Sequence, residues 1–117
     1  MLTITSGLPL DAEDEEVRLL CALGGEAARN TVYSILLTSL YDRQVAMYQA
    51  ILDAGAMQGA FSLATDALTI ARNLVALEDA YGYRIVAGHP ILDHDACAEL
   101  ILNYARLVTD HPLTKEP

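Results

Sequence analysis

AMQGAFSLATDALTIARNLVALEDA, residues 56–80, is the stretch that decides the fold. On a helical wheel its apolar residues cover an arc of about 200°, wider than the stripe of about 100° on an ordinary surface helix. A row of small residues runs through this arc: Ala60, Ala64, Ala67 and Ala71. We therefore expect a central helix over residues 56–80 that ends near Tyr81 and Gly82 and contacts neighbouring helices on two sides.

Helices are expected before and after this stretch. The acids and glycines that frame residues 11–23 indicate a first helix, and apolar periodicity indicates a second over residues 26–52, followed by a break at residues 53–55. A loop over residues 82–92 and a fourth helix over residues 93–109 complete the pattern. The expected fold is all-α, a four-helix antiparallel bundle with long second and third helices, with dimerisation as a further means of covering its apolar arcs.

The composition fits one helical domain. Of the 117 residues, 53% are hydrophobic, with one Phe and no Trp, and Ala is abundant, which favours closely packed helices. No repeat or linker divides the chain. We expect a single domain over residues 1–117, with an extended arm at residues 1–10 and a frayed tail at residues 111–117.

The second predicted helix carries a row of residues spaced alternately four and three apart. We call this set the heptad row: Tyr33, Leu37, Leu40, Gln44, Met47 and Ile51. Such spacing is typical of a coiled-coil seam, but the row spans less than the three or four heptads that identify one. The row therefore predicts either the buried face of one long bundle helix or a helix-pairing seam.

The net charge of −9 limits the partners. A surface of that sign repels nucleic-acid phosphates and anionic membranes, so we expect no direct binding to either. The N-terminal residues lack the basic region of a signal peptide, no apolar run is long enough to cross a bilayer, and the two cysteines form no dense framework, so we expect a cytoplasmic protein.

Polar residues that lack an obvious structural role are the candidates for contacting a partner. Acids crowd the start of the first predicted helix, two tyrosines lie one heptad apart at the edge of the apolar stripe of the second, and an acidic pair lies at the end of the third. The tyrosines should bury their rings and keep their hydroxyls wet, whereas the acidic pair is unfavourable at a helix C-terminus. The predicted partner-binding residues are Glu13, Asp14, Glu15, Glu16, Tyr41, Tyr48, Glu78 and Asp79.

Catalytic, cofactor and metal sites are not expected. His89, Asp93, His94, Asp95 and Cys97 form a cluster of metal-type ligands, but their spacing does not place them on one helical face, and Asp93 and Asp95 suit a helix start. No nucleophile–base–acid spacing and no phosphate-binding glycine loop is present in the sequence.

Three functions remain open. The first is a non-enzymatic protein that acts through protein–protein interaction as a homodimer, because broad apolar arcs mark interfaces. The second is an acidic inhibitor or decoy of the anti-defence or anti-CRISPR type, which would block the nucleic-acid-binding surface of a basic protein. The third is a small-ligand-binding or metal-binding helical bundle, with a pocket lined by the tyrosines and by His89 or His94.

Overall fold

The computed structural model describes residue 8 and residues 29–113 of the chain. These residues contain helices α2 (Thr31–Met57), α3 (Ala67–Val86) and α4 (His94–Thr109), and they contain no strand. The described part of the fold is therefore all-helical, as predicted. The predicted arm over residues 1–10, apart from Leu8, and the first helix over residues 11–23 lie outside the described residues, so the four-helix bundle stays a prediction.

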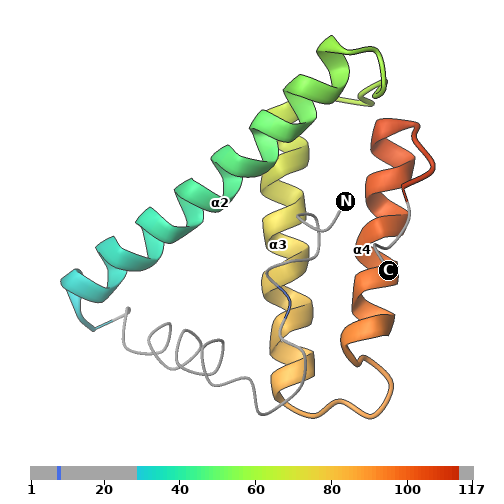
Figure 1. The fold of residues 1–117 in the computed structure, drawn as a ribbon. Helices are drawn as coiled ribbons and strands as arrows, with labels where there is room; N and C mark the ends of the chain where they lie inside the picture. Colours follow the sequence, from blue (N-terminus) through green and yellow to red (C-terminus); the bar gives the residue numbers. More distant parts are fainter. Residues whose placement is uncertain (1–7, 9–28, 114–117) are drawn as a thin grey trace.

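Helix α3 lies between α2 and α4 and contacts both (Figure 1). The prediction that the third helix has neighbours on two sides is confirmed. Its buried residues recur every three or four positions, and several of them are completely inaccessible to solvent, including Ile70, Ala71 and Leu74. On α4 the same spacing buries Cys97, Ile101 and Ala105 against it.

The predicted ends of the second and third helices are wrong. Helix α2 continues through the expected break at residues 53–55, residues 58–66 form the connection, and α3 begins only at Ala67. Asp66 fixes this start, because its carboxylate accepts hydrogen bonds from the Thr69 backbone N–H at 3.0 Å and from the Thr69 hydroxyl. These bonds lower the pKa of the Asp66 carboxyl.

Two glycines that were predicted to end helices lie inside them. Gly55 is helical and buried because the Phe61 ring lies directly against it, where a Cβ atom would come within 2.1 Å of the ring. Gly82 is buried within α3, which runs on to Val86, so the predicted loop over residues 82–92 is shortened from its start. Among the described glycines, Gly59 and Gly88 turn the chain, with φ of 77° and 73°.

Only two of the four alanines in the predicted row of small residues are buried in α3. Ala67 and Ala71 are buried in α3, as expected for a close helix contact, whereas Ala60 and Ala64 lie exposed in the 58–66 connection. That connection packs instead against the end of α4. The Ser62 N–H donates to the Thr109 carbonyl at 2.9 Å, and the Ala64 N–H donates to the Val108 carbonyl at 2.8 Å. Carbonyls that a helix end leaves without internal partners are thus satisfied from another segment.

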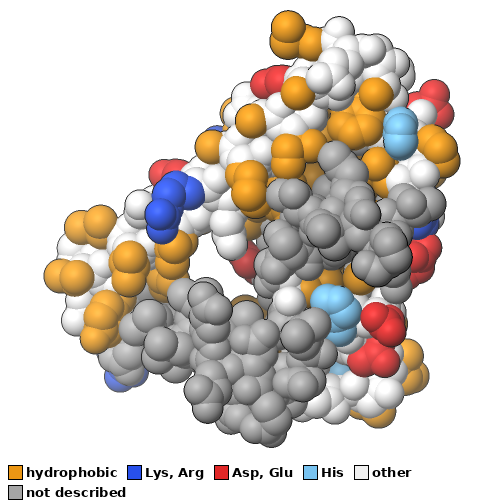
Figure 2. All heavy atoms as spheres, viewed as in Figure 1, with side chains coloured by type: hydrophobic (Ala, Val, Ile, Leu, Met, Phe, Trp, Pro, Cys, Tyr) orange, Lys and Arg blue, Asp and Glu red, His pale blue; other side chains and the backbone are white. Residues whose placement is uncertain are grey.

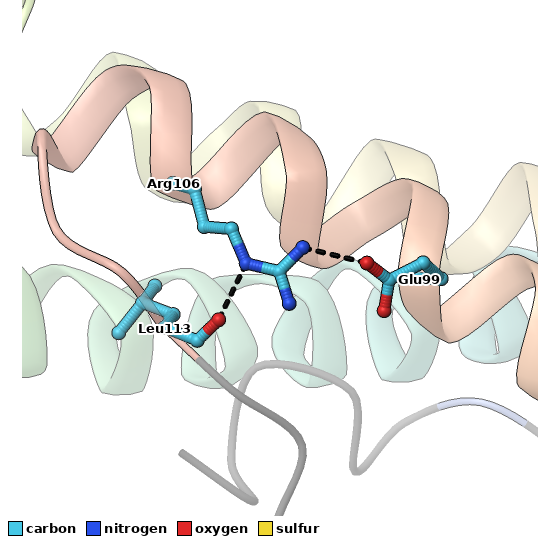
Figure 3. Close-up of polar contacts among 3 residues, drawn as sticks. All are labelled: Glu99, Arg106 and Leu113. Carbon is cyan, nitrogen blue, oxygen red and sulfur yellow. Dashed lines mark hydrogen bonds and ion pairs between the residues drawn. The ribbon is translucent and has the colours of Figure 1, made fainter.

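The fourth predicted helix is confirmed. Asp93 caps α4 by accepting from the Ala96 N–H at 2.9 Å, and Asp110 ends it in the left-handed conformation. The chain then folds back on the helix. The Arg106 guanidinium donates to the Leu113 carbonyl and pairs with Glu99 at 2.6 Å (Figure 3). Leu113 is buried, so the predicted frayed tail does not begin at residue 111, and residues 114–117 lie outside the described part.

Candidate interaction surface

Helix α2 divides into two halves that differ in burial. Its four buried residues, Val45, Tyr48, Leu52 and Gly55, all lie in the second half, where the helix packs on α3. The first half, residues 31–44, contains no buried residue. Figure 1 shows this half diverging from α3 towards its N-terminus.

The first half of α2 is nevertheless strongly apolar. Val32 is 71% exposed, Ile35 65% and Leu36 44%. In the space-filling view, hydrophobic side chains gather over this end of the helix (Figure 2). The side chain of Asn30 starts the helix, accepting from the Val32 N–H at 3.0 Å and from the Tyr33 N–H at 3.3 Å. The N-terminus of α2 is therefore capped by a side chain, although no residue of the first half is buried.

The heptad row is not the buried face of α2. Four of its residues are half-buried, and Gln44 and Met47 are exposed. The buried residues lie on a neighbouring face, turned from the row by about 80° at 3.6 residues per turn. The row is therefore not the face that packs on α3, and its use as a helix-pairing seam stays a prediction.

Tyr48 and Glu78 form a buried pair between α2 and α3. Tyr48 is 1% exposed and Glu78 6%, and the Tyr48 hydroxyl donates a hydrogen bond to the Glu78 carboxylate. Burial raises the pKa of the Tyr48 hydroxyl, and the charge of Glu78 raises it further. The expectation of a wet Tyr48 hydroxyl is wrong, and Glu78 lies inside α3 rather than at its end.

The other predicted contact residues are separate from this pair. Asp79 is exposed on α3, and Tyr41 is half-buried on α2. The acids Glu13, Asp14, Glu15 and Glu16 lie outside the described residues. Two of the predicted contact residues, Tyr48 and Glu78, are thus buried between α2 and α3. The sequence analysis did not single out the exposed Val32, Ile35 and Leu36, which lie in the predicted second helix but outside the heptad row.

The cluster around His89 has structural roles. The Nδ1 atom of His89 accepts hydrogen bonds from the Ile91 and Leu92 N–H groups at 3.1 and 3.0 Å, and Asp93 caps α4. Cys97 is fully buried, and burial raises the pKa of its thiol, with the charge of Asp93 adding to the effect. Within residue 8 and residues 29–113, no group of three or more His, Cys, Asp or Glu side chains could hold a metal ion.

A hollow of about 490 Å³ lies beside the first half of α2. The described residues that line it are Ser34, Ile35, Thr38, Ser39, Asp42, Arg43 and Ala46. They include none of the tyrosines or histidines expected for a ligand pocket. In the described part of the chain, no helix is both long and apolar enough to cross a membrane.

Comparisons with known protein families, curated proteins and solved structures give no match. A function for this chain must therefore be argued from its own residues.

Proposed function

We propose that this protein is non-enzymatic and acts through protein–protein contact, associating with a second copy of itself through α2. The observation that carries the proposal is the first half of α2, which is apolar yet has no buried residue. Contiguous apolar surface of this kind usually marks an interface. The commonest homo-oligomer is a two-fold dimer, in which the same patch of each copy meets the other.

The energy available supports an interface that uses more than this one patch. Fully burying a Val, Ile or Leu side chain contributes about 1.5–3 kcal/mol. Val32, Ile35 and Leu36 are 71%, 65% and 44% exposed, so each copy would gain about 4 kcal/mol by covering them. Two copies together gain about 8 kcal/mol. Association itself costs at least about 4 kcal/mol, so at most about half of that free energy remains to hold the dimer together. The contact must therefore continue along α2, over residues such as Met47.

Charge also favours α2 over the rest of the chain as the contact between identical copies. The protein has a net charge of −9, but α2 carries only Asp42, Arg43 and Asp53, a net charge of −1. Like-charged molecules repel least where few charges approach one another. A nearly neutral helix is thus the surface on which two copies meet at the lowest electrostatic cost.

The roles of the reactive side chains support a non-enzymatic function. Cys97 is buried, and its raised pKa disfavours the thiolate that acts as a nucleophile. His89 and Asp93 use their polar atoms in the turn before α4 and in the cap of α4. The buried Tyr48–Glu78 pair joins two helices.

The test measures molar mass by size-exclusion chromatography with light scattering at micromolar concentration. We expect a dimer for the natural protein and a monomer for the Leu36→Glu variant. The matched control is Leu100→Glu on α4, because Leu36 and Leu100 are both 44% exposed. The control should remain a dimer. A monomer mass for the natural protein, or dissociation by Leu100→Glu alone, contradicts the proposal.

A further inference from the structure

We infer that two copies meet with their α2 helices running in the same direction, so that Asp42 of each copy pairs with Arg43 of the other. This inference rests on the self-association proposed above and specifies the residues that recognise the second copy. The contact is made by one exposed face of α2, which we call the outer patch. Its members are all exposed: Val32, Ile35, Leu36, Ser39, Asp42, Arg43 and Ala46.

The outer patch points away from α3. At about 100° per residue, its centre lies about 150° around the helix from the mean direction of the buried residues of α2. Val32 and Ile35, which are 71% and 65% exposed, lie within about 30° of that centre. A hollow of about 490 Å³ also opens beside part of the patch, at Ile35, Ser39, Asp42, Arg43 and Ala46. The patch therefore offers exposed apolar surface and space beside it.

Two charges of opposite sign flank the centre of the patch. Asp42 and Arg43 are about 100° apart around the helix, and Ser39 and Ala46 lie within about 10° of the line midway between them. Within the described part of the chain, neither Asp42 nor Arg43 makes an ion pair or a side-chain hydrogen bond. The outer patch thus has one acidic edge and one basic edge, with small side chains between them.

The opposite charges of the two edges select the direction of pairing. When two identical helices related by a two-fold axis run in the same direction, each edge of one helix meets the other edge of its partner. When they run in opposite directions, like edges meet. Parallel contact therefore forms the Asp42–Arg43 pair twice, whereas antiparallel contact brings like charges together. The small Ser39 and Ala46 side chains at the centre allow the helix axes to approach to about 8 Å.

The remaining acidic residues do not oppose this arrangement. Residues 58–113 contain seven acids and three arginines, a net charge of −4 with His neutral. Because the outer patch faces away from α3, three helix spacings of about 8–10 Å separate the two α3 helices. That distance is about three times the screening length of about 8 Å in physiological salt. Asp53 lies about 15 Å along α2 from Arg43, so helices that cross near Arg43 have diverged there.

Charge reversal tests the pairing, with the dissociation constant of the dimer measured by analytical ultracentrifugation. Arg43→Glu should raise this constant about tenfold or more, because both Asp42–Arg43 contacts become contacts between like charges. Asp42→Arg should do the same. The double variant Asp42→Arg/Arg43→Glu restores opposite charges and should return the constant to within about threefold of the natural value.

Arg72→Glu is the matched control for Arg43→Glu. Arg72 is exposed on α3 and makes no ion pair within the described residues, and its replacement changes the net charge by the same amount. We expect this control to leave the dissociation constant within about threefold of the natural value. Circular dichroism checks that each variant is as helical as the natural protein.

Cysteine cross-linking tests the direction of the helices. Identical positions meet in a parallel pair, so Ser39→Cys should form a disulfide-linked dimer on oxidation. Gln44→Cys is the control, because Gln44 is exposed on a different face of α2. We expect the Ser39→Cys yield to be about tenfold higher. The natural protein, oxidised alongside, gives the background from Cys21 and Cys97.

The outcomes separate this inference from the proposed function. If Arg43→Glu behaves like Arg72→Glu, if the double variant dimerises no better than the single ones, or if Ser39→Cys cross-links no better than Gln44→Cys, the parallel pairing is wrong and the proposed self-association stands. A natural protein that is monomeric overturns both.

Discussion

The two halves of α2 are one continuous helix with opposite relations to the rest of the chain. The second half buries Val45, Tyr48 and Leu52 against α3, whereas the first half buries nothing and exposes Val32, Ile35 and Leu36. Both halves are apolar, so composition does not separate them. The difference teaches that hydrophobic content sets how much apolar surface a helix has to bury. Tertiary contacts decide which part of that surface is buried.

The largest expected effect is in the second half. Leu52 is 2% exposed, so Leu52→Ala removes a fully packed side chain and leaves a cavity. We expect the free energy of unfolding to fall by about 2–5 kcal/mol. Urea denaturation followed by circular dichroism measures this as a lower midpoint at unchanged slope. A loss below about 1 kcal/mol would show that the second half is not the anchored one.

Gly55→Ala tests how closely the second half meets the 58–66 connection. Alanine favours a helix by about 1 kcal/mol over glycine, but here its Cβ would lie 2.1 Å from the Phe61 ring. We expect a net destabilisation of about 1–3 kcal/mol. The double variant with Phe61→Leu should recover part of the loss in the same urea titration. A stabilised single variant would contradict the close approach.

Tyr48→Phe removes the hydroxyl that joins the second half to Glu78. We expect a loss of about 1–3 kcal/mol at neutral pH, because a buried hydrogen bond to a charged group is broken. The folded protein raises the pKa of Tyr48, so unfolding releases that phenolic proton once the pH exceeds the unfolded value of about 10. Tyr48 then makes stability fall by about 1.4 kcal/mol per pH unit above pH 10.

The comparison with Tyr48→Phe should isolate this slope. Urea midpoints measured from pH 9 to 11 should fall more steeply for the natural protein than for the variant. Tyr83→Phe is the matched control, because it removes the hydroxyl of a tyrosine that is 55% exposed. Equal slopes in all three proteins would contradict a buried, hydrogen-bonded Tyr48.

The smallest expected effect is in the first half. Leu36→Ala shortens a side chain that is 44% exposed, and we expect the stability of the isolated monomer to change by less than about 0.5 kcal/mol. Thermal and urea unfolding at submicromolar concentration measure this value. A loss like that of Leu52→Ala would mean that the first half is packed within its own chain.

The sequence predicted the parts of the fold that depend on local signals. Asp93 marks the start of α4 as expected, and the broad apolar arc of the third helix correctly indicated neighbours on two sides. The boundaries between α2 and α3 were wrong because Gly55 was interpreted as a stop, although it serves a ring contact that only the folded connection creates. Periodicity alone has no means of distinguishing these two uses of a glycine.

The candidate site was less predictable, because it depends on the register between helices. Glu78 was recognised as locally unusual, but its partner Tyr48 lies 30 residues away, on another helix. The heptad row of α2 was one of two apolar faces, and nothing in its spacing indicated that α3 would take the other. The exposed first half follows from the angle at which α2 leaves α3, a tertiary quantity that no local pattern encodes.

The hydrogen bonds from Ser62 and Ala64 to the end of α4 have a consequence for the order of folding. The start of the 58–66 connection is held locally, because the Ala60 and Phe61 N–H groups donate to the Gly55 carbonyl, whereas its middle is held by the carbonyls at positions 108 and 109. Residues 62–64 therefore gain these contacts only when α4 docks. Closing so long a loop costs entropy before any contact is gained. We therefore expect the middle of the connection to become ordered together with α4 rather than with the α2–α3 contact alone.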